Sequence, residues 1–137
     1  MKKIIFLITF ILISVNNVNA ATFNWKKAAS TVDSSSTWYY DKKTVFKVGG
    51  FIYFWQLTDY KKIVDGEGSV ITHSMVNCDT YEMRWIIVAS YSSHMGKGKI
   101  VTDVILPEFD KDYFKWDYYD PENTTQGALL KKVCKLI

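Results

Sequence analysis

Histidine and serine side chains are the residues of this chain that could carry out catalysis. A catalytic histidine needs a nucleophile to activate or a carboxylate that orients it. His73 lies beside Ser74, and His94 follows Ser92 and Ser93. However, the chain lacks the Gly-x-Ser-x-Gly motif that exposes a nucleophilic serine at a sharp turn. We therefore expect no catalytic residue and a protein that is not an enzyme.

Histidine and methionine also ligate metals and haem iron, which makes His73, His94 and Met95 the candidates for such a site. The two histidines lie far apart in the sequence, and no Cys-x-x-Cys pair accompanies them. The segment Gly96-Lys97-Gly98-Lys99 lacks the spacing of a phosphate-binding loop. We expect no metal site and no cofactor. A carrier of a small hydrophobic ligand or haem stays open as the alternative function.

The start of the chain has the features of an export signal. Met1–Lys3 is positively charged, residues 4–13 are almost entirely apolar, and Val18–Ala20 fits the site that signal peptidase accepts. The apolar run is about half of the ~20 residues that span a membrane. We expect residues 1–20 to be a signal peptide and residues 21–137 to form a single domain. No cysteine lies near the cleavage point, which predicts a periplasmic or surface location without a lipobox lipid anchor.

Without Lys2 and Lys3, fifteen basic residues face fourteen acidic ones, so the net charge of the exported chain is +1. A charge this small favours no polyanionic partner, and we expect no nucleic-acid binding. The exported part also contains no apolar run long enough for a membrane span.

The two cysteines, Cys78 and Cys134, are expected to pair, because the chain is destined for an oxidising compartment. A reactive thiol or a metal ligand is the other interpretation, but neither cysteine has a histidine or cysteine at ligand spacing. The bond would close a loop of 56 residue steps. The chain-entropy model gives such a loop a stabilisation of about 4 kcal/mol.

Most of the exported chain has the sequence features of β-strands, followed by one helix. Gly49-Gly50 predicts a hairpin turn between two strand-like runs. At the other end of the chain, Asn123 or Thr124 is a candidate N-cap, and apolar residues then recur at helical spacing up to Ile137. Cys134 falls on the apolar side of that helix. The predicted fold class is α+β, an antiparallel β-sheet with one C-terminal helix packed on it and tied by the disulfide.

A period of two predicts which face of one strand is buried. Met83, Trp85, Ile87, Ala89 and Tyr91 alternate with Glu82, Arg84 and, later, Ser90. We expect Trp85, Ile87 and Tyr91 to be buried, with Glu82 and Arg84 facing outward. In the earlier run from residue 51 to 57, the odd and even positions are both apolar at first, which predicts a strand covered on both sides.

The segment from residue 108 to 119 mixes acidic and aromatic residues, which is unusual for a plain loop. One interpretation is a loop that covers the core. The other is a protein-binding surface, since tyrosine and tryptophan are enriched at interface hot spots. The candidate binding residues are Tyr113, Trp116, Tyr118 and Tyr119.

An ordered set of short motifs extends over most of the exported chain. The set consists of WYYD at 38–41, Gly49-Gly50, WQLTDY at 55–60, Ser69-Val70, Asn77-Cys78-Asp79, Arg84, YSSHMGKG at 91–98, Trp116 and Cys134. In this order the motifs resemble the bacterial surface-adhesin protein E family of small exported proteins. The resemblance implies an antiparallel sheet with a C-terminal helix, a disulfide, the capacity to dimerise, and adhesion to host extracellular matrix proteins. The expected function is therefore an exported, non-enzymatic binding module whose partner is a host or envelope protein.

Overall fold

The computed structural model describes residues 22–105 and 115–137. The expected signal peptide, residues 1–20, lies outside these ranges, and so does Tyr113. In chain order the elements are β1 (Trp25–Ser30), β2 (Ser36–Asp41), the 3-10 turn η1 (Lys42–Thr44), β3 (Phe46–Val48), β4 (Phe51–Val64), β5 (Glu67–Asn77), β6 (Glu82–Tyr91), the 3-10 turn η2 (His94–Gly96), β7 (Ile100–Ile105), β8 (Asp117–Tyr118) and α1 (Thr125–Cys134).

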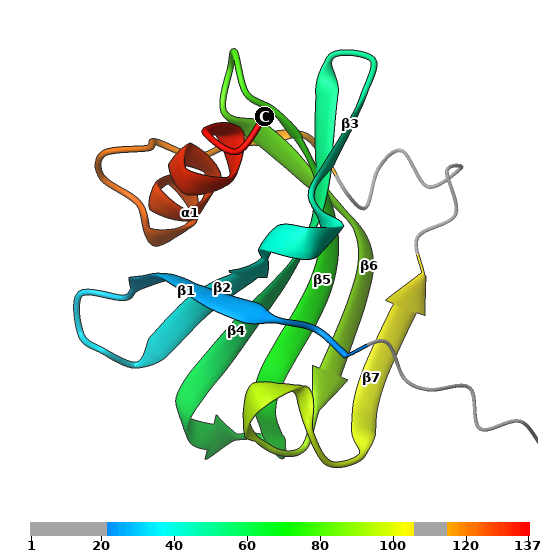
Figure 1. The fold of residues 1–137 in the computed structure, drawn as a ribbon. Coiled ribbons are helices and arrows are strands. Elements are labelled where there is room, and N and C mark those ends of the chain that lie inside the picture. The colour runs from blue at the N-terminus through cyan, green and yellow to red at the C-terminus, as the bar shows by residue number, and fades with distance from the viewer. Residues whose placement is uncertain (1–21, 106–114) are drawn as a thin grey trace, which may run out of the picture.

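The strands form one antiparallel sheet in the order β1-β2-β4-β5-β6-β7, while β3 pairs with β4 and β8 pairs with β6. Neighbours in the sheet are mostly neighbours in the sequence, as tight hairpins allow. Gly49 has a φ of +61° in the β3–β4 hairpin, where a left-handed residue is needed. Figure 1 shows α1 and the C terminus near one end of the sheet and the η2 segment at the opposite end. The predicted α+β fold is confirmed.

The strand register sorts side chains onto two faces of the sheet. On one face, Ile52 and Phe54 of β4 lie opposite Val76 and Ser74 of β5, and α1 packs over them. We call this side the helix face. The opposite side carries the odd-numbered residues of β4 from Phe51 to Leu57 and is called the aromatic face. The covering predicted for both sides of this strand is found on the helix face, whereas on the aromatic face Phe51, Tyr53 and Trp55 are half-buried and Leu57 is buried.

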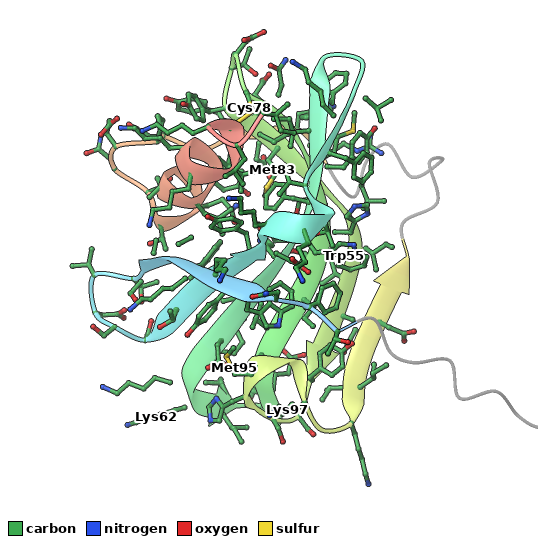
Figure 2. All side chains as sticks on the ribbon, in the orientation of Figure 1. Trp55, Lys62, Cys78, Met83, Met95 and Lys97 are labelled. Atoms are coloured by element: carbon green, nitrogen blue, oxygen red, sulfur yellow. A yellow bond between two sulfur atoms is a disulfide. The ribbon has the colours of Figure 1, made fainter. Side chains whose placement is uncertain are left out.

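The main core lies between α1 and one end of the helix face. Its buried members are Ala28, Ile52, Phe54, Val76, Met83, Leu129, Leu130 and Val133. Each such large apolar side chain contributes about 1.5–3 kcal/mol by leaving water, so this cluster holds the helix on the sheet. Figure 2 shows Met83 and Cys78 at this end of the molecule.

The disulfide is formed as predicted. Cys78 directly follows β5 and Cys134 is the last residue of α1, with 5.7 Å between their Cα atoms. The bond therefore ties the C-terminal helix to the β5–β6 turn.

The start of α1 is fixed by side-chain hydrogen bonds. Thr124 is the N-cap: its hydroxyl accepts from the backbone N–H of Gly127 at 2.9 Å and donates to the carbonyl of Asp120 at 2.8 Å. The helix ends at Cys134, so Ile137 lies beyond it and is 57% exposed. Placing Ile137 on the buried face of the helix was therefore wrong.

A β-bulge in β6 overturns the predicted alternation. Trp85 pairs with Ser74 and Ile87 pairs with His73, which leaves Ile86 as an extra residue without a partner on β5. Trp85 therefore lies on the helix face, whereas Ile87, like the later Tyr91, lies on the same face as Arg84. The single buried face predicted for residues 82–91 is wrong, because one extra residue exchanges the two faces of everything beyond it.

Three further elements complete the sheet. Residues 25–30 form edge strand β1 against β2. β4 continues to Val64, and a tight turn at Asp65-Gly66 leads into β5. In the aromatic segment before the helix, residues 117–118 add the short strand β8 beside β6.

Candidate functional site

A ladder of aromatic rings runs across the aromatic face. His73 of β5 stacks on Trp55 of β4, with 4.6 Å between ring centroids and 18° between the ring planes. The ring of Tyr53 lies 6.1 Å from His73, and Phe46 of β3 stacks on Tyr53 at 5.1 Å. Cross-strand register produces these contacts, because Phe46 pairs with Tyr53 and Trp55 pairs with His73.

Both ends of the ladder are extended by other segments. Phe23 lies 5.5 Å from Trp55 and stacks on Trp25 at 4.6 Å. Towards the other end of β4, Phe51 meets Trp116 at 5.4 Å. Segments far apart in the sequence thus place their rings on one side of the sheet, and Figure 2 shows Trp55 midway between the α1 end and the η2 end.

The residues predicted as a binding surface do not form one cluster in the structure. Trp116 lies on the aromatic face against Phe51, and Tyr118, which pairs with Glu82, is 63% exposed. Tyr119 instead packs against the core under α1, and this burial raises the pKa of its phenol, with a smaller contribution from Asp117. Tyr113 lies outside the described residues.

The centre of this surface was not predicted from the sequence. Phe46 is 47% exposed, and Tyr53, Trp55 and His73 are half-buried around it. The alternation in β4 was the available signal, because it put Phe51, Tyr53 and Trp55 on one side of a strand. That signal was interpreted as burial alone, since the sequence does not show that α1 covers the other face.

Arg84 adds a guanidinium to the aromatic face, where it pairs with Met75 of β5. The side chain is half-buried, and its Nε has no hydrogen-bond partner among the residues described. A guanidinium in this position is available to a carbonyl or carboxylate of a bound partner.

His73 is the histidine within this surface. Its Nε2 is buried and has no hydrogen-bond partner within residues 22–105 and 115–137. Burial disfavours the charged imidazolium, so the pKa of His73 lies below its ordinary value of 6.5. Its neighbours are aromatic rings, and none of the described hydrogen bonds joins it to a serine or a carboxylate.

The buried position of His73 predicts a loss of stability in mild acid. The unfolded chain takes up a proton near pH 6.5, whereas the folded protein does so only at lower pH, so acid favours unfolding in that interval. Melting temperatures measured from about pH 7 to about pH 5 should fall less steeply in His73→Phe, which keeps the ring stack without the titrating group. His94→Gln is the control, since it leaves the stack intact and should retain the His73 contribution. If the melting temperatures of His73→Phe and the wild type fall equally steeply with decreasing pH, this assignment is contradicted.

His94 belongs to a separate arrangement at the η2 end. Its Nδ1 lies 3.6 Å from Asp59 Oδ1, the atom that also accepts a 2.6 Å hydrogen bond from the backbone N–H of Met95. Next to it, the Ser69 hydroxyl accepts from the N–H of Gly96 at 2.8 Å. These bonds hold the YSSHMGKG segment against one end of the central strands of the sheet. They also stabilise the left-handed backbone of Met95, which has a φ of +57°. They do not bring His94 together with His73.

Two other features, a metal site and a membrane-spanning helix, are absent from residues 22–105 and 115–137. His, Cys, Asp and Glu side chains do not gather there in a group of three or more that could hold a metal ion. None of the helices in this part has the length and hydropathy needed to cross a membrane.

Comparison with known proteins gives the family. The model of the family described as "Surface-adhesin protein E" matches residues 25–135, which is most of the chain. This chain belongs to the surface-adhesin protein E family. The match begins at β1 and ends just after α1, so it includes both faces of the sheet and the disulfide.

Solved structures of Haemophilus influenzae protein E have the same fold as this member of the surface-adhesin protein E family. One, described as crystal form II, has 16% sequence identity and a TM-score of 0.57, and the match covers 85% of this chain and 94% of that one. Another, from non-typeable Haemophilus influenzae, has 14% identity and a TM-score of 0.52 over 84% and 81% of the two chains. No curated protein sequence matches this chain.

Proposed function

We propose that this family member is an exported adhesin that binds a host protein, such as one of the extracellular matrix, through the aromatic face. The observation that carries the proposal is the ring ladder, which leaves Phe46 and Trp116 exposed instead of completing a core. Contiguous aromatic surface on a small protein is typical of an interaction site.

The composition of the aromatic face suits a protein partner. Tryptophan, tyrosine and arginine are the residue types that dominate binding hot spots. The face carries several of each aromatic and one guanidinium: Trp25, Tyr53, Trp55, Arg84, Trp116 and Tyr118. Its rings are also held by their stacking, so little side-chain entropy remains to be lost on binding.

Truncating one exposed ring should test this proposal. Phe46→Ala and Trp116→Ala should each weaken binding to an immobilised matrix protein by about 2 kcal/mol or more if they are hot spots, which is a loss of about 30-fold in affinity. The measurement is surface plasmon resonance of the exported chain against a panel of purified matrix proteins. Ile63→Ala is the matched control, because Ile63 is a 54% exposed apolar residue in the turn region at the end of β4.

If both ring variants bind with the affinity of the wild type, the binding surface lies elsewhere. A uniform loss in all three variants would instead indicate a general folding defect, which their melting temperatures would reveal. Sedimentation velocity on the same samples tests dimerisation, because a dimer that buries the aromatic face should be weakened by Phe46→Ala.

The cellular location belongs to the same proposal. We propose export to the cell surface, in keeping with the adhesin family, without a lipobox lipid anchor. Proteolysis of the protein on intact cells is the test: digestion without lysis supports surface display, and protection until the outer membrane is opened supports a periplasmic protein.

A second candidate function, the carriage of a small hydrophobic ligand or haem, is supported by one cavity. It has a volume of about 510 Å³ between the N-terminal segment and η2, and Phe23, Trp25, Ile71, Tyr91 and Met95 supply its apolar lining. This is within the usual size range of ligand pockets. An absorbance titration with haem separates this function from protein binding, since only a haem carrier shifts the Soret band.

A further inference from the structure

The side chains on the helix face change from apolar to mainly polar at the point where α1 no longer covers the sheet. Near the disulfide, its cross-strand rows are apolar, with Ile52, Val76 and Met83 under the helix. The row that pairs Gln56 with Thr72, and the row beyond it, carry mainly uncharged polar side chains. The first turn of α1 marks the boundary, because Gln126 and Gln56 donate to each other's side-chain oxygens at 3.0 and 3.2 Å.

Beyond this boundary lies a groove with a volume of about 360 Å³. The side chains that line it come from four strands, β2, β4, β5 and β6: Ser36, Trp38, Gln56, Thr58, Tyr60, Val70, Thr72, Trp85 and Val88. The lining thus combines three aromatic rings with hydroxyl and amide groups. The ring of Trp38 is fixed in place, because its Nε1 donates a 3.0 Å hydrogen bond to the Ser36 hydroxyl.

Among the residues that the structure describes, those lining the groove include no charged side chain. Phosphate, carboxylate and ammonium groups would therefore enter without a counter-charge, at a large desolvation cost. A purely apolar ligand fits no better, since it would cover the Thr58 hydroxyl without giving it a hydrogen bond, and would leave the Thr72 hydroxyl with only the 3.5 Å hydrogen bond that it accepts from Ser74. The chemistry that fits is neutral, carries several hydroxyls and has one apolar face, which describes a pyranose ring.

The surroundings of the groove favour a sugar that is part of a longer chain. A second cavity of about 500 Å³ shares Ser36 and Tyr60 with the groove and opens among Asp33, Lys61 and Lys62. Tyr60 is part of the lining of both cavities, so a ligand longer than one ring can extend from the groove into the second cavity.

We propose that the groove on the helix face binds a neutral hexose unit of a glycan. One face of the sugar stacks on the aromatic rings, and its hydroxyls exchange hydrogen bonds with Thr58 and Thr72, while the rest of the glycan leaves through the second cavity. The site lies on the side of the sheet opposite the aromatic face, so it goes beyond the proposed protein-binding function and does not depend on it.

The five tryptophans separate the two sites in one measurement. Trp38 and Trp85 line the groove, whereas the other three lie on the aromatic face. The probes are methyl hexosides and neutral linear disaccharides, titrated to tens of millimolar into the ¹⁵N-labelled exported chain. The expected result is a saturable shift of the indole N–H signals of Trp38 and Trp85, with those of the aromatic face unmoved.

Near-isosteric variants then assign the hydrogen bonds. Thr58→Val and Thr72→Val each remove one hydroxyl from the groove and should weaken sugar binding about 3- to 10-fold, the usual range for one neutral hydrogen bond. The control is Thr37→Val on β2, since Thr37 pairs with Asp59 and so lies on the aromatic face. The amide spectrum of each variant shows whether it is folded, and Thr58→Val, at a half-buried position, carries the test if Thr72→Val unfolds.

Two outcomes would overturn this assignment. One is the absence of any shift at Trp38 and Trp85 with every neutral sugar. The other is saturable binding of an apolar dye in the groove that tightens in Thr58→Val, which would make the groove a hydrophobic-ligand site. Neither outcome bears on the aromatic face, whose failure would be seen only in the binding of Phe46→Ala and Trp116→Ala to matrix proteins.

Discussion

Replacing Cys134 with serine should lower the free energy of unfolding by about 2–5 kcal/mol, the usual loss for a native disulfide in a small exported domain. The bond closes a loop of 56 residue steps, and reduction or substitution restores the entropy of that loop to the unfolded chain. Because the free energy of unfolding of a small domain is only about 5–15 kcal/mol, the loss is a large part of the total stability.

The location of the disulfide at the end of α1 is a further reason to expect this loss of stability. Cys134 is the last residue of α1, so without the bond the helix is held on the sheet by its apolar cluster, its N-terminal contacts and the hydrogen bond that Lys132 donates to the Ala28 carbonyl. Urea denaturation of Cys134→Ser, Cys78→Ser and the double variant is the measurement. The three should lose similar free energy, since each removes the same bond. Alkylation of the non-reduced wild type, followed by mass spectrometry, must show no free thiol; two labelled cysteines would refute the pairing.

Local sequence signals predicted the parts of this fold that local interactions determine. The Gly49-Gly50 turn and the alternation in β4 each depend on backbone preference or period within a few residues. The N-cap at Thr124 is another such signal. Export and the count of two cysteines were enough to predict the disulfide, because in this chain there is one way to pair them.

The bulge at Ile86 illustrates what a period cannot show. Residues 82–91 alternate well enough to predict one buried face, yet the extra residue is defined only by pairing with β5, which is distant in sequence. The same reason applies to Phe46, whose role depends on stacking against Tyr53 and, through it, on His73. The face on which these residues lie and the rings that they contact are determined by tertiary pairing, not by composition.

The candidate surfaces show the same division. An aromatic count predicted a recognition surface but located it in one continuous segment, whereas the ladder draws its rings from β1, β3, β4, β5 and the β8 flank. The groove was not predictable at all, since it exists only because α1 ends its cover at Gln126. Which half of the helix face stays open is set by the docking of the helix.

Gly127→Ala, within α1, should therefore destabilise the protein, against the usual rule for helices. Alanine is favoured over glycine in a helix interior by about 1 kcal/mol. At this position, however, an added Cβ would overlap the backbone carbonyl of Asp120 and come within 2.7 Å of the Thr124 hydroxyl. The Asp120 carbonyl cannot simply move, because it accepts hydrogen bonds from both the N–H and the hydroxyl of Thr124. We expect a net loss of about 1–3 kcal/mol, as for overpacking of a closed site.

The matched control is Gly50→Ala in the β3–β4 hairpin, where an added Cβ meets no atom within 4 Å and φ is not positive. This variant should stay within about 1 kcal/mol of the wild type, or gain slightly from the stiffer unfolded chain. Urea denaturation of both variants gives the comparison, and a Gly127→Ala protein as stable as the wild type would show that the contact with Asp120 is loose. Because Gly127 follows Gln126, the same substitution should also disturb the Gln126–Gln56 pair, so the indole signals of Trp38 and Trp85 should shift even without a ligand.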